Sequence, residues 1–242
     1  MSNSNVSPHL IDQPVIFYPG TLCDERIFTP CWQYLDIPKR AFVPLQWAQN
    51  LEHMQMLSND RFDYFDEPVH LVGYSMGGYI AALSAIENKG RVASLTLIGS
   101  SCNALPEAAI KQRQHTLKLI QNKQFKGSTD KHIAKYFHEV NQDDELLKGI
   151  VTEMEEDLGS GVLEAHLIAT GQRKNLLPQL SKCGFKTHFI VGEQDHLVNL
   201  EELKQSVGNL AFADLHIVQN AGHMVPLEQP QLLARNLINL IA

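Results

Sequence analysis

The chain has 242 residues, of which 44% are hydrophobic and 19% charged, and its formal net charge is −7. This length and composition are typical of a globular α/β domain, and no apolar run approaches the roughly 18 residues that a membrane-spanning helix needs. Lys and Arg are never concentrated in one stretch, which argues against a nucleic-acid-binding surface. We therefore expect a small-molecule partner, and neither nucleic acid nor membrane.

Two further features indicate the compartment. Residues Met1 to Pro8 are polar and contain neither a basic region nor a long apolar segment, so they do not resemble a secretory signal. The four cysteines are widely scattered and show no metal-type pairing, which favours free thiols in a reducing cytoplasm over a disulfide framework. We expect a cytoplasmic protein whose thiols are Cys23, Cys31, Cys102 and Cys183.

Apolar runs that predict strands alternate along the chain with stretches of helical periodicity. This alternation is typical of a parallel sheet with crossover helices, and fully apolar strands fit a sheet that is covered on both faces. The predicted fold class is thus α/β, a mostly parallel sheet of about six strands flanked by helices. The predicted strands are 14–18, 42–47, 69–74, 94–99, 187–191 and 215–218, and the predicted core helices are 51–66, 76–88, 199–207 and 227–241.

The alternation breaks once, between residues 103 and 181, where only helical patterns occur. We predict an α/β core formed by 1–102 and 182–242, carrying 103–181 as an all-helical lid over the carboxyl ends of the strands, where ligands bind in such sheets. One of its helices has seven carboxylates opposite an apolar stripe, which we interpret as a solvated face rather than a cation site. The predicted helices of the lid are 106–124, 129–139, 142–158 and 161–172.

A serine lies between a predicted strand and a predicted helix, in the pentapeptide Gly73-Tyr74-Ser75-Met76-Gly77. A nucleophilic serine on such a sharp turn has a strained backbone, and the positions two before and two after it must lack a Cβ so that strand and helix can approach. Gly73 and Gly77 meet that demand. The simpler alternative is a serine in a tight turn with no chemistry.

A serine hydroxyl needs a base to take its proton, and the base needs an acid to fix its tautomer. The turn after strand 187–191 contains Asp195, and His223 lies in a loop after the last strand. Each carboxyl end thus presents one member of a Ser, Asp and His set. The rival acids are Glu193 and Asp214, and the rival histidines are His196, adjacent to Asp195, and His216, inside the last strand.

These motifs resemble those of the α/β-hydrolase superfamily over nearly the whole chain. The matching stretches are Gly-Tyr-Ser-Met-Gly-Gly at 73–78, Val-Gly-Glu-Gln-Asp at 191–195 and Ala-Gly-His-Met-Val-Pro-Leu-Glu-Gln-Pro at 221–230. They look most like the small capped group of carboxylesterases, carrier-protein methyl ester esterases and the menaquinone-pathway synthase that eliminates pyruvate. The resemblance favours Asp195 as the acid, and it implies that the N-terminal edge of the sheet is shortened here.

The resemblance also implies an oxyanion hole made of two backbone N–H groups. One is that of Met76, at the start of a helix whose positive end favours an anion. The other belongs to Thr21, in a loop where the family usually shows His-Gly-X and this chain has Pro19-Gly20-Thr21. Pro19 removes a side chain that often braces this loop. Leu22 and Tyr79 are candidate substrate-binding residues.

The implied reaction is hydrolysis of a small carboxylic ester or thioester through an acyl-enzyme. Serine in place of aspartate disfavours the dehalogenase and epoxide hydrolase chemistries of the superfamily. No nucleotide or metal motif occurs, so we expect no cofactor and no metal; a carrier protein is a further candidate partner. One alternative is a pyruvate-eliminating lyase, whose usual Arg four residues after the nucleophile is replaced by Tyr79, although Arg113 and Arg173 remain to meet an anion. A second alternative is a non-catalytic ligand-binding member.

Overall fold

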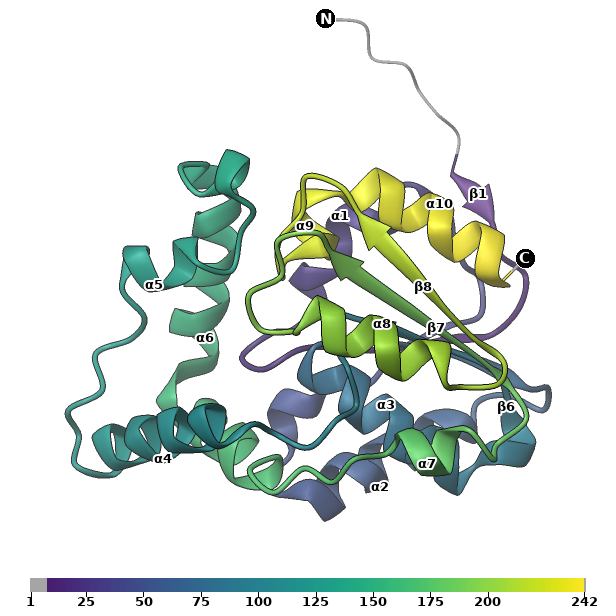
Figure 1. The fold of residues 1–242 in the computed structure, drawn as a ribbon, viewed down its shortest axis with the longest axis horizontal. Helices are drawn as coiled ribbons and strands as arrows, with labels where there is room; N and C mark the ends of the chain where they lie inside the picture. The colour runs from purple at the N-terminus through teal and green to yellow at the C-terminus, as the bar shows by residue number, and fades with distance from the viewer. Residues whose placement is uncertain (1–7, 242) are drawn as a thin grey trace, which may run out of the picture.

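The computed structural model of the chain describes residues 8–241 (Figure 1). The prediction about a secretory signal concerns residues that, apart from Pro8, lie outside the described ones. Within 8–241, no helix combines the length and the apolar character needed to cross a bilayer. All four cysteines are free thiols, as the sequence predicts.

The core of the fold is a six-stranded sheet in which every neighbouring pair of strands is parallel. This confirms the predicted fold class. The four inner strands are largely buried because helices cover both faces of the sheet, and the two edge strands are partly exposed. From one edge to the other the strands are β4 (Arg40–Phe42), β2 (Val15–Tyr18), β5 (Val69–Tyr74), β6 (Val92–Ile98), β7 (Lys186–Gly192) and β8 (Ala213–Val218).

Two hydrophobic clusters form the core, one on each face of the sheet. The first is closed by α2 (Leu51–Phe62), α3 (Met76–Glu87), α7 (Leu177–Leu180) and α8 (Leu200–Gly208). The second is closed by α1 (Thr29–Trp32), α9 (Val225–Glu228) and α10 (Pro230–Ile241). Two short strands that the sequence did not predict, β1 (His9–Leu10) and β3 (Leu35–Asp36), pair in parallel outside the main sheet.

The predicted strand 42–47 is wrong over most of its length. β4 ends at Phe42, and the backbone follows its neighbour for only one more hydrogen bond, from Val43 N to the carbonyl of Phe17. Pro44 has no N–H to donate to a ladder, and residues Leu45–Trp47 coil into a 3₁₀ turn, η2. Val43, Pro44 and Leu45 are buried, whereas Trp47 is exposed, and an apolar run alone does not distinguish a strand from a turn.

The chain between β6 and β7 contains helices and no strand in the described structure. Figure 1 shows three of these helices beside the core. They lie beyond the arrowheads of β7 and β8, which mark the carboxyl ends of these strands. α6 is bent at Gly159, whose φ of 73° and ψ of 173° are not helical, so the two helices predicted at 142–158 and 161–172 meet at this bend. The three helices are α4 (Glu107–Gln121), α5 (Asp130–Ala134) and α6 (Glu145–Ala169), and 3₁₀ turn η4 (Glu139–Asn141) lies between the last two.

Candidate active site

Ser75 lies where β5 passes into α3, with a φ of 51° that an L-residue rarely adopts. The two flanking glycines explain how the turn is made. A Cβ on Gly77 would lie 2.3 Å from the carbonyl oxygens of Tyr18 and Pro19, and one on Gly73 would lie 2.6 Å from the carbonyl oxygen of Gly77. Neither position tolerates a side chain, as the sequence pattern predicts.

The structure brings Ser75, His223 and Asp195 together in one chain of hydrogen bonds. Nε2 of His223 is 2.9 Å from Oγ of Ser75, and Nδ1 of His223 is 2.8 Å from Oδ2 of Asp195. Asp195 follows the end of β7, and His223 lies in the loop between β8 and α9. With Nδ1–H donating to the carboxylate, Nε2 presents its lone pair to the serine hydroxyl, which is the tautomer that a general base needs.

The carboxylate of Asp195 is held in its charged form. Burial by itself would raise the pKa of Asp195, but the neighbouring His223 imidazole and two backbone N–H groups outweigh it and lower that pKa below its ordinary value. The two N–H groups are those of Leu197 and Val198, which donate to Oδ1 at 2.8 and 3.0 Å. The other carboxylate oxygen is therefore left to orient the imidazole.

The rival acids and histidines have other partners. Glu193 accepts a hydrogen bond from the Asn220 N–H at 2.6 Å, and His196 is exposed. Asp214 and His216 bond to each other at 3.0 Å on the strand β8 itself. None of the four belongs to the hydrogen-bonded chain at Ser75.

The backbone around His223 is fixed by groups that the sequence analysis did not single out. The His223 N–H donates to the carbonyl of Tyr136 at 2.7 Å, so a residue between α5 and η4 holds the histidine loop. Glu228 joins the same two segments, since its two carboxylate oxygens accept from the N–H of Gly222 at 2.8 Å and of His138 at 2.7 Å. Glu228 lies inside the matched motif at 221–230, whereas a backbone carbonyl leaves no sequence signal.

The predicted oxyanion donors lie in adjacent segments. Because Gly77 presses against the carbonyls of Tyr18 and Pro19, the turn that continues to Thr21 borders the start of α3, where Met76 is. Neither the Met76 nor the Thr21 N–H donates a hydrogen bond to another residue of the described chain. Both amides are thus free for an incoming oxygen.

A buried histidine from α6 braces this turn. Nδ1 of His166 accepts from the Leu22 N–H at 3.2 Å, and its Nε2 lies 3.1 Å from the carbonyl of Leu45. Burial lowers the pKa of His166 to about 4, so the ring is neutral, with its proton on Nε2. His166 thus supports the turn in which Pro19 replaces the family's usual histidine, and it occupies the Leu22 amide while leaving that of Thr21 free.

The two predicted substrate-binding residues differ in their surroundings. Leu22 has a φ of 53° and contributes its N–H to His166. Tyr79 is buried, and its hydroxyl accepts from the Lys174 N–H at 3.0 Å. The guanidinium of Arg173 lies 5.0 Å from the Tyr79 ring.

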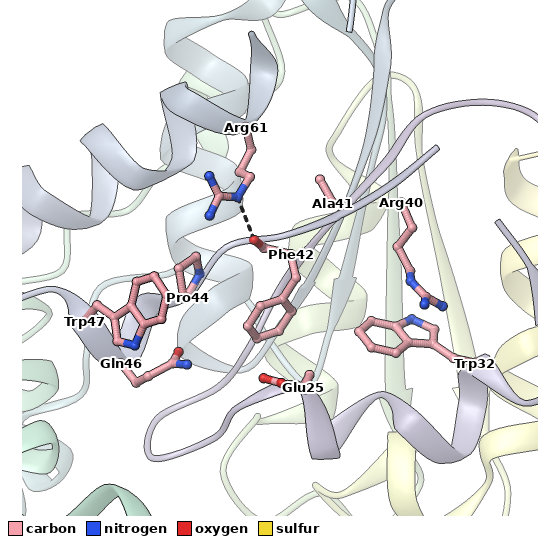
Figure 2. A pocket seen from close by; sticks show the side chains of 9 residues that line it. All are labelled: Glu25, Trp32, Arg40, Ala41, Phe42, Pro44, Gln46, Trp47 and Arg61. Atoms are coloured by element: carbon pink, nitrogen blue, oxygen red, sulfur yellow. Dashed lines mark hydrogen bonds between the residues drawn. The ribbon is translucent and has the colours of Figure 1, made fainter. Parts of the chain in front are cut away.

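Two cavities lie outside the hydrogen-bonded chain. One, of about 600 Å³, is formed between α4, the end of α6 and the segment leading to α7, and it includes Arg113, Arg173 and Lys174. Figure 2 shows the other, of about 410 Å³, which is walled by aromatic rings near the end of β4 and contains none of Ser75, Asp195 and His223. Its lining residues are Glu25, Trp32, Arg40, Ala41, Phe42, Pro44, Gln46, Trp47 and Arg61.

A family model described as the alpha/beta hydrolase fold matches residues 64–230, well over half of the chain. The chain belongs to the α/β-hydrolase family. Among curated proteins, this α/β-hydrolase is 24% identical to monoacylglycerol lipase ABHD6 of Bos taurus over 188 residues. The match covers 73% of this chain and 55% of the lipase, so the chain spans about half the length of that relative.

Solved structures resemble the α/β-hydrolase over almost its whole length. A thermophilic esterase from Thermogutta terrifontis superimposes with a TM-score of 0.80 at 16% identity, covering 96% of this chain and 90% of the esterase. MenH from S. aureus superimposes with a TM-score of 0.74 at 18% identity, covering 99% of this chain and 96% of MenH. At such identities the likeness describes the fold.

Proposed function

We propose that this α/β-hydrolase is a serine hydrolase that cleaves a small carboxylic ester or thioester through an acyl-enzyme intermediate. The observation that carries the proposal is the hydrogen-bonded chain from Ser75 through His223 to Asp195. The family match and the esterases and lipases among the similar proteins support the broader class of hydrolase. The protein needs no cofactor in this proposal.

In the proposed reaction, Oγ of Ser75 attacks the substrate carbonyl while Nε2 of His223 takes the hydroxyl proton. Asp195 stabilises the imidazolium that forms. The N–H groups of Met76 and Thr21 bind the oxyanion, and each such donor is worth roughly 2.7–4 kcal/mol of barrier. His223 then gives its proton to the departing alcohol or thiol, and it activates the water that hydrolyses the acyl-enzyme.

We also propose that residues 103–181 act as a lid on a core formed by 1–102 and 182–242. The support is the position of α4, α5 and α6 beyond the carboxyl ends of the strands (Figure 1), and the contact between Tyr136 and His223. The chain has already rejoined the core at Leu176 and Leu177, which pack in the cluster around α3. The proposed lid therefore ends before α7.

The decisive substitution is Ser75→Ala. Without the nucleophile, we expect hydrolysis of p-nitrophenyl acetate and butyrate to fall by roughly 10⁴-fold or more, with an unchanged circular dichroism spectrum. Ser206→Ala on α8 is the matched control and should retain full activity. Equal activity of Ser75→Ala and the control would reject the assignment.

A fluorophosphonate probe separates an enzyme from a non-catalytic ligand-binding member of the family. The proposal predicts that the probe labels the wild-type protein at Ser75 and does not label Ser75→Ala. Failure to label the wild-type protein would favour the binding role.

A second candidate function involves an anionic substrate, with the pyruvate-eliminating lyase as its example. Arg113 and Arg173 line the cavity of about 600 Å³, and no carboxylate pairs with either guanidinium among residues 8–241. Nε of Arg173 is buried without a hydrogen-bond partner. Burial, and then the charge of Arg113, lower the pKa of Arg173 to about 10. Such a cation gains most from an anionic ligand.

Arg173 links this cavity to the candidate site, because its guanidinium lies over the ring of Tyr79. Tyr79 follows Ser75 by four residues and so lies roughly 6 Å further along α3. If an anion binds there, Arg173→Gln should raise KM at least roughly tenfold for a monoester of a dicarboxylic acid and leave KM for p-nitrophenyl acetate unchanged. The lyase would be established instead if the protein released pyruvate from the cyclohexadiene substrate of the menaquinone-pathway synthase faster than it hydrolysed esters under the same conditions. Equal effects of Arg173→Gln on charged and neutral esters would contradict an anion subsite.

A further inference from the structure

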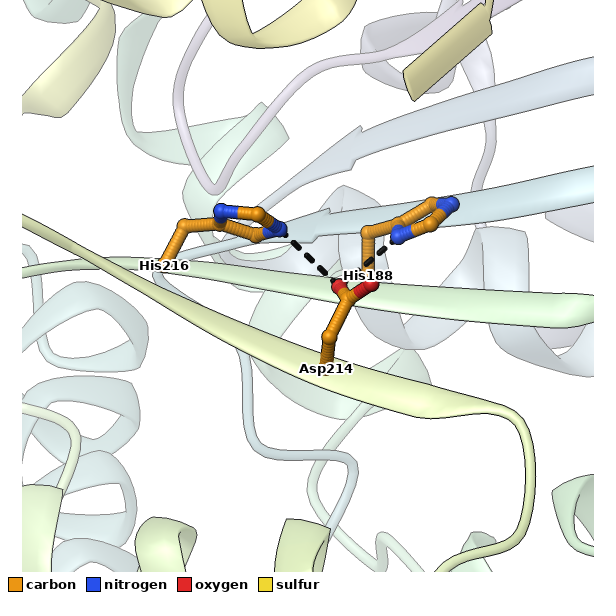
Figure 3. Close-up of side chains that lie close together, drawn as sticks. All are labelled: His188, Asp214 and His216. Atoms are coloured by element: carbon orange, nitrogen blue, oxygen red, sulfur yellow. Dashed lines mark hydrogen bonds and ion pairs between the residues drawn. The ribbon is translucent and has the colours of Figure 1, made fainter. Parts of the chain in front are cut away.

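Three side chains on adjacent strands converge at a place that the proposed reaction does not use. His188 on β7 pairs in register with Asp214 on β8, and His216 follows two residues later, so all three lie on the same face of the sheet. Figure 3 shows the two imidazoles on either side of the Asp214 carboxylate. Four residues of strand, roughly 13 Å, separate His188 from the carboxyl end of β7 at Gly192. The cluster therefore lies toward the opposite end of the strands from Ser75.

The nitrogen and oxygen atoms of these side chains are close enough to share one ion. Oδ1 of Asp214 is 2.7 Å from Nδ1 of His188 and 3.0 Å from Nε2 of His216, and one ligand atom from each residue lies within 4.8 Å of the other two. Ligands at roughly 2.0–2.1 Å from a tetrahedral Zn²⁺ ion are about 3.3 Å apart. Side-chain rotations would therefore have to lengthen the two short separations, by up to about 0.6 Å, and bring the two imidazole nitrogens, which lie within 4.8 Å of each other, closer together.

We propose that His188, Asp214 and His216 form a binding site for a divalent transition-metal ion, with Zn²⁺ the ion that two imidazoles and one carboxylate suit best. Each ring presents to the ion the nitrogen that faces Asp214 and carries its single proton on the other nitrogen, so both imidazoles change tautomer and neither loses a proton. The half-exposed side chains of Asp214 and His216 give it access from solvent and leave room for water as a fourth ligand.

The surroundings of the cluster support this assignment. Asp214 has no Lys or Arg partner in the described part of the chain, so its charge is met only by the two imidazoles. His188 is buried, and its Nε2 lacks a hydrogen-bond partner, as does the buried hydroxyl of Thr96, which is its register partner on β6. A histidine that binds a metal through Nδ1 carries its proton on Nε2 and donates it to a nearby acceptor. The Thr96 hydroxyl lies on the neighbouring strand, but the two groups do not bond to each other in this structure.

The function of the site is to join the edge strand β8 to β7, since the ligands come from both. An ion that binds the folded chain and not the unfolded chain raises the free energy of unfolding by RT ln(1 + c/Kd), where c is the concentration of the free ion. The site serves structure rather than the chemistry at Ser75, so the expectation that hydrolysis needs no metal is unaffected.

The test is Zn²⁺ binding to the full chain, without an affinity tag, by isothermal titration calorimetry, with Co²⁺ absorption as a second readout. We expect one Zn²⁺ per chain and a raised Tm. Asp214→Asn and His216→Asn should each weaken binding at least roughly tenfold, and they should reduce the rise in Tm at the same Zn²⁺ concentration. Because these two residues are half-exposed, their variants test the site without the folding risk of replacing His188.

The matched control is His53→Asn, an exposed histidine on α2, which should bind Zn²⁺ like the wild type. Two results would overturn the proposal. One is a wild-type chain that binds no Zn²⁺. The other is unchanged binding by Asp214→Asn and His216→Asn, which would place the ion on other histidines.

Discussion

His166 shows how one side chain can prepare a site that it does not enter. Its ring accepts from the Leu22 N–H and approaches the Leu45 carbonyl, so α6 is tied to the turn at 19–22 and to η2. The turn bears the Thr21 amide that we propose as an oxyanion donor. His166 is therefore a positioning residue, and its loss should act on the transition state more than on substrate binding.

Replacing His166 by Phe tests this role. The ring volume is kept, but the Leu22 N–H and the Leu45 carbonyl lose their partner, at a cost of about 1–3 kcal/mol for each buried group. We expect kcat for p-nitrophenyl butyrate to fall at least roughly tenfold while KM changes little, as steady-state kinetics would show. His115→Phe, at an exposed position on α4, should leave both constants unchanged. A variant that loses stability but keeps kcat would make His166 a purely structural residue.

Among individual residues, the sequence pointed to those that lie in recognisable motifs. It missed His166 and Tyr136, which hold backbone segments of the candidate site in place. Ser75, Asp195 and His223 were found because each follows a predicted strand and lies in a stretch with a recognisable spacing. His166 was missed because, between Ala165 and Leu167, it reads as one position of an ordinary helix. Tyr136 contributes only its carbonyl, which any residue could supply.

The turn from β5 into α3 depends on packing as much as on conformation. α3 approaches the end of β2 so closely that only a glycine fits at position 77, between the carbonyls of Tyr18 and Pro19. The same approach places the turn at 19–22, with the proposed oxyanion donor Thr21, next to Ser75. Steric fit between a helix and a neighbouring strand thus fixes the geometry of the site.

A pair of Gly→Ala substitutions separates this steric demand from helix propensity. Gly77→Ala puts a methyl group 2.3 Å from two backbone oxygens, and we expect it to destabilise the fold by roughly 3 kcal/mol and to remove most activity. Gly149→Ala, inside α6 with no atom within 4 Å of the added carbon, should stabilise by roughly 0.5–1 kcal/mol. Urea unfolding measures both changes. A similar free energy of unfolding for the two variants would refute the steric argument.

Prediction of helices and strands succeeded where the hydrophobic periodicity agreed with the residues that end an element. The central strands and α3 were predicted to within two residues because long apolar runs end at Gly, Asn or Ser. Prediction of 42–47 as a strand failed because Pro44 outweighed the apolar character of its neighbours. The bend at Gly159 was seen as a gap between two helices, since a glycine in a helical pattern leaves open whether the helix stops or turns.

Across the molecule, the buried His166 and the half-buried His70 make stability depend on pH. Burial lowers the pKa of His166 from 6.5 to about 4, and burial, with the charge of His188, does the same for His70. Between these values the unfolded chain binds protons that the folded chain does not. The stability that these two neutral histidines contribute is therefore fully present above pH 6.5. It is lost as the pH drops from about 6.5 toward 4.

The size of this effect can be measured by urea unfolding at pH 7.5 and pH 5.0. For His166 alone the change over this interval is roughly 2 kcal/mol, at about 1.36 kcal/mol per pKa unit. His166→Gln should be less stable than the wild type at pH 7.5 and should lose less stability on acidification. An equally steep pH dependence in this variant would show that other groups cause it.

The hydrogen bond from the His223 N–H to the Tyr136 carbonyl bears on how substrate range could be engineered. Chimeras that exchange the whole stretch between β6 and β7 with that of a homologue would also exchange the support of His223, the proposed general base. Libraries that randomise α4 and keep residues 136–138 would vary the proposed lid and preserve that support. Recombination breakpoints in this stretch are thus better placed before α5 than after it.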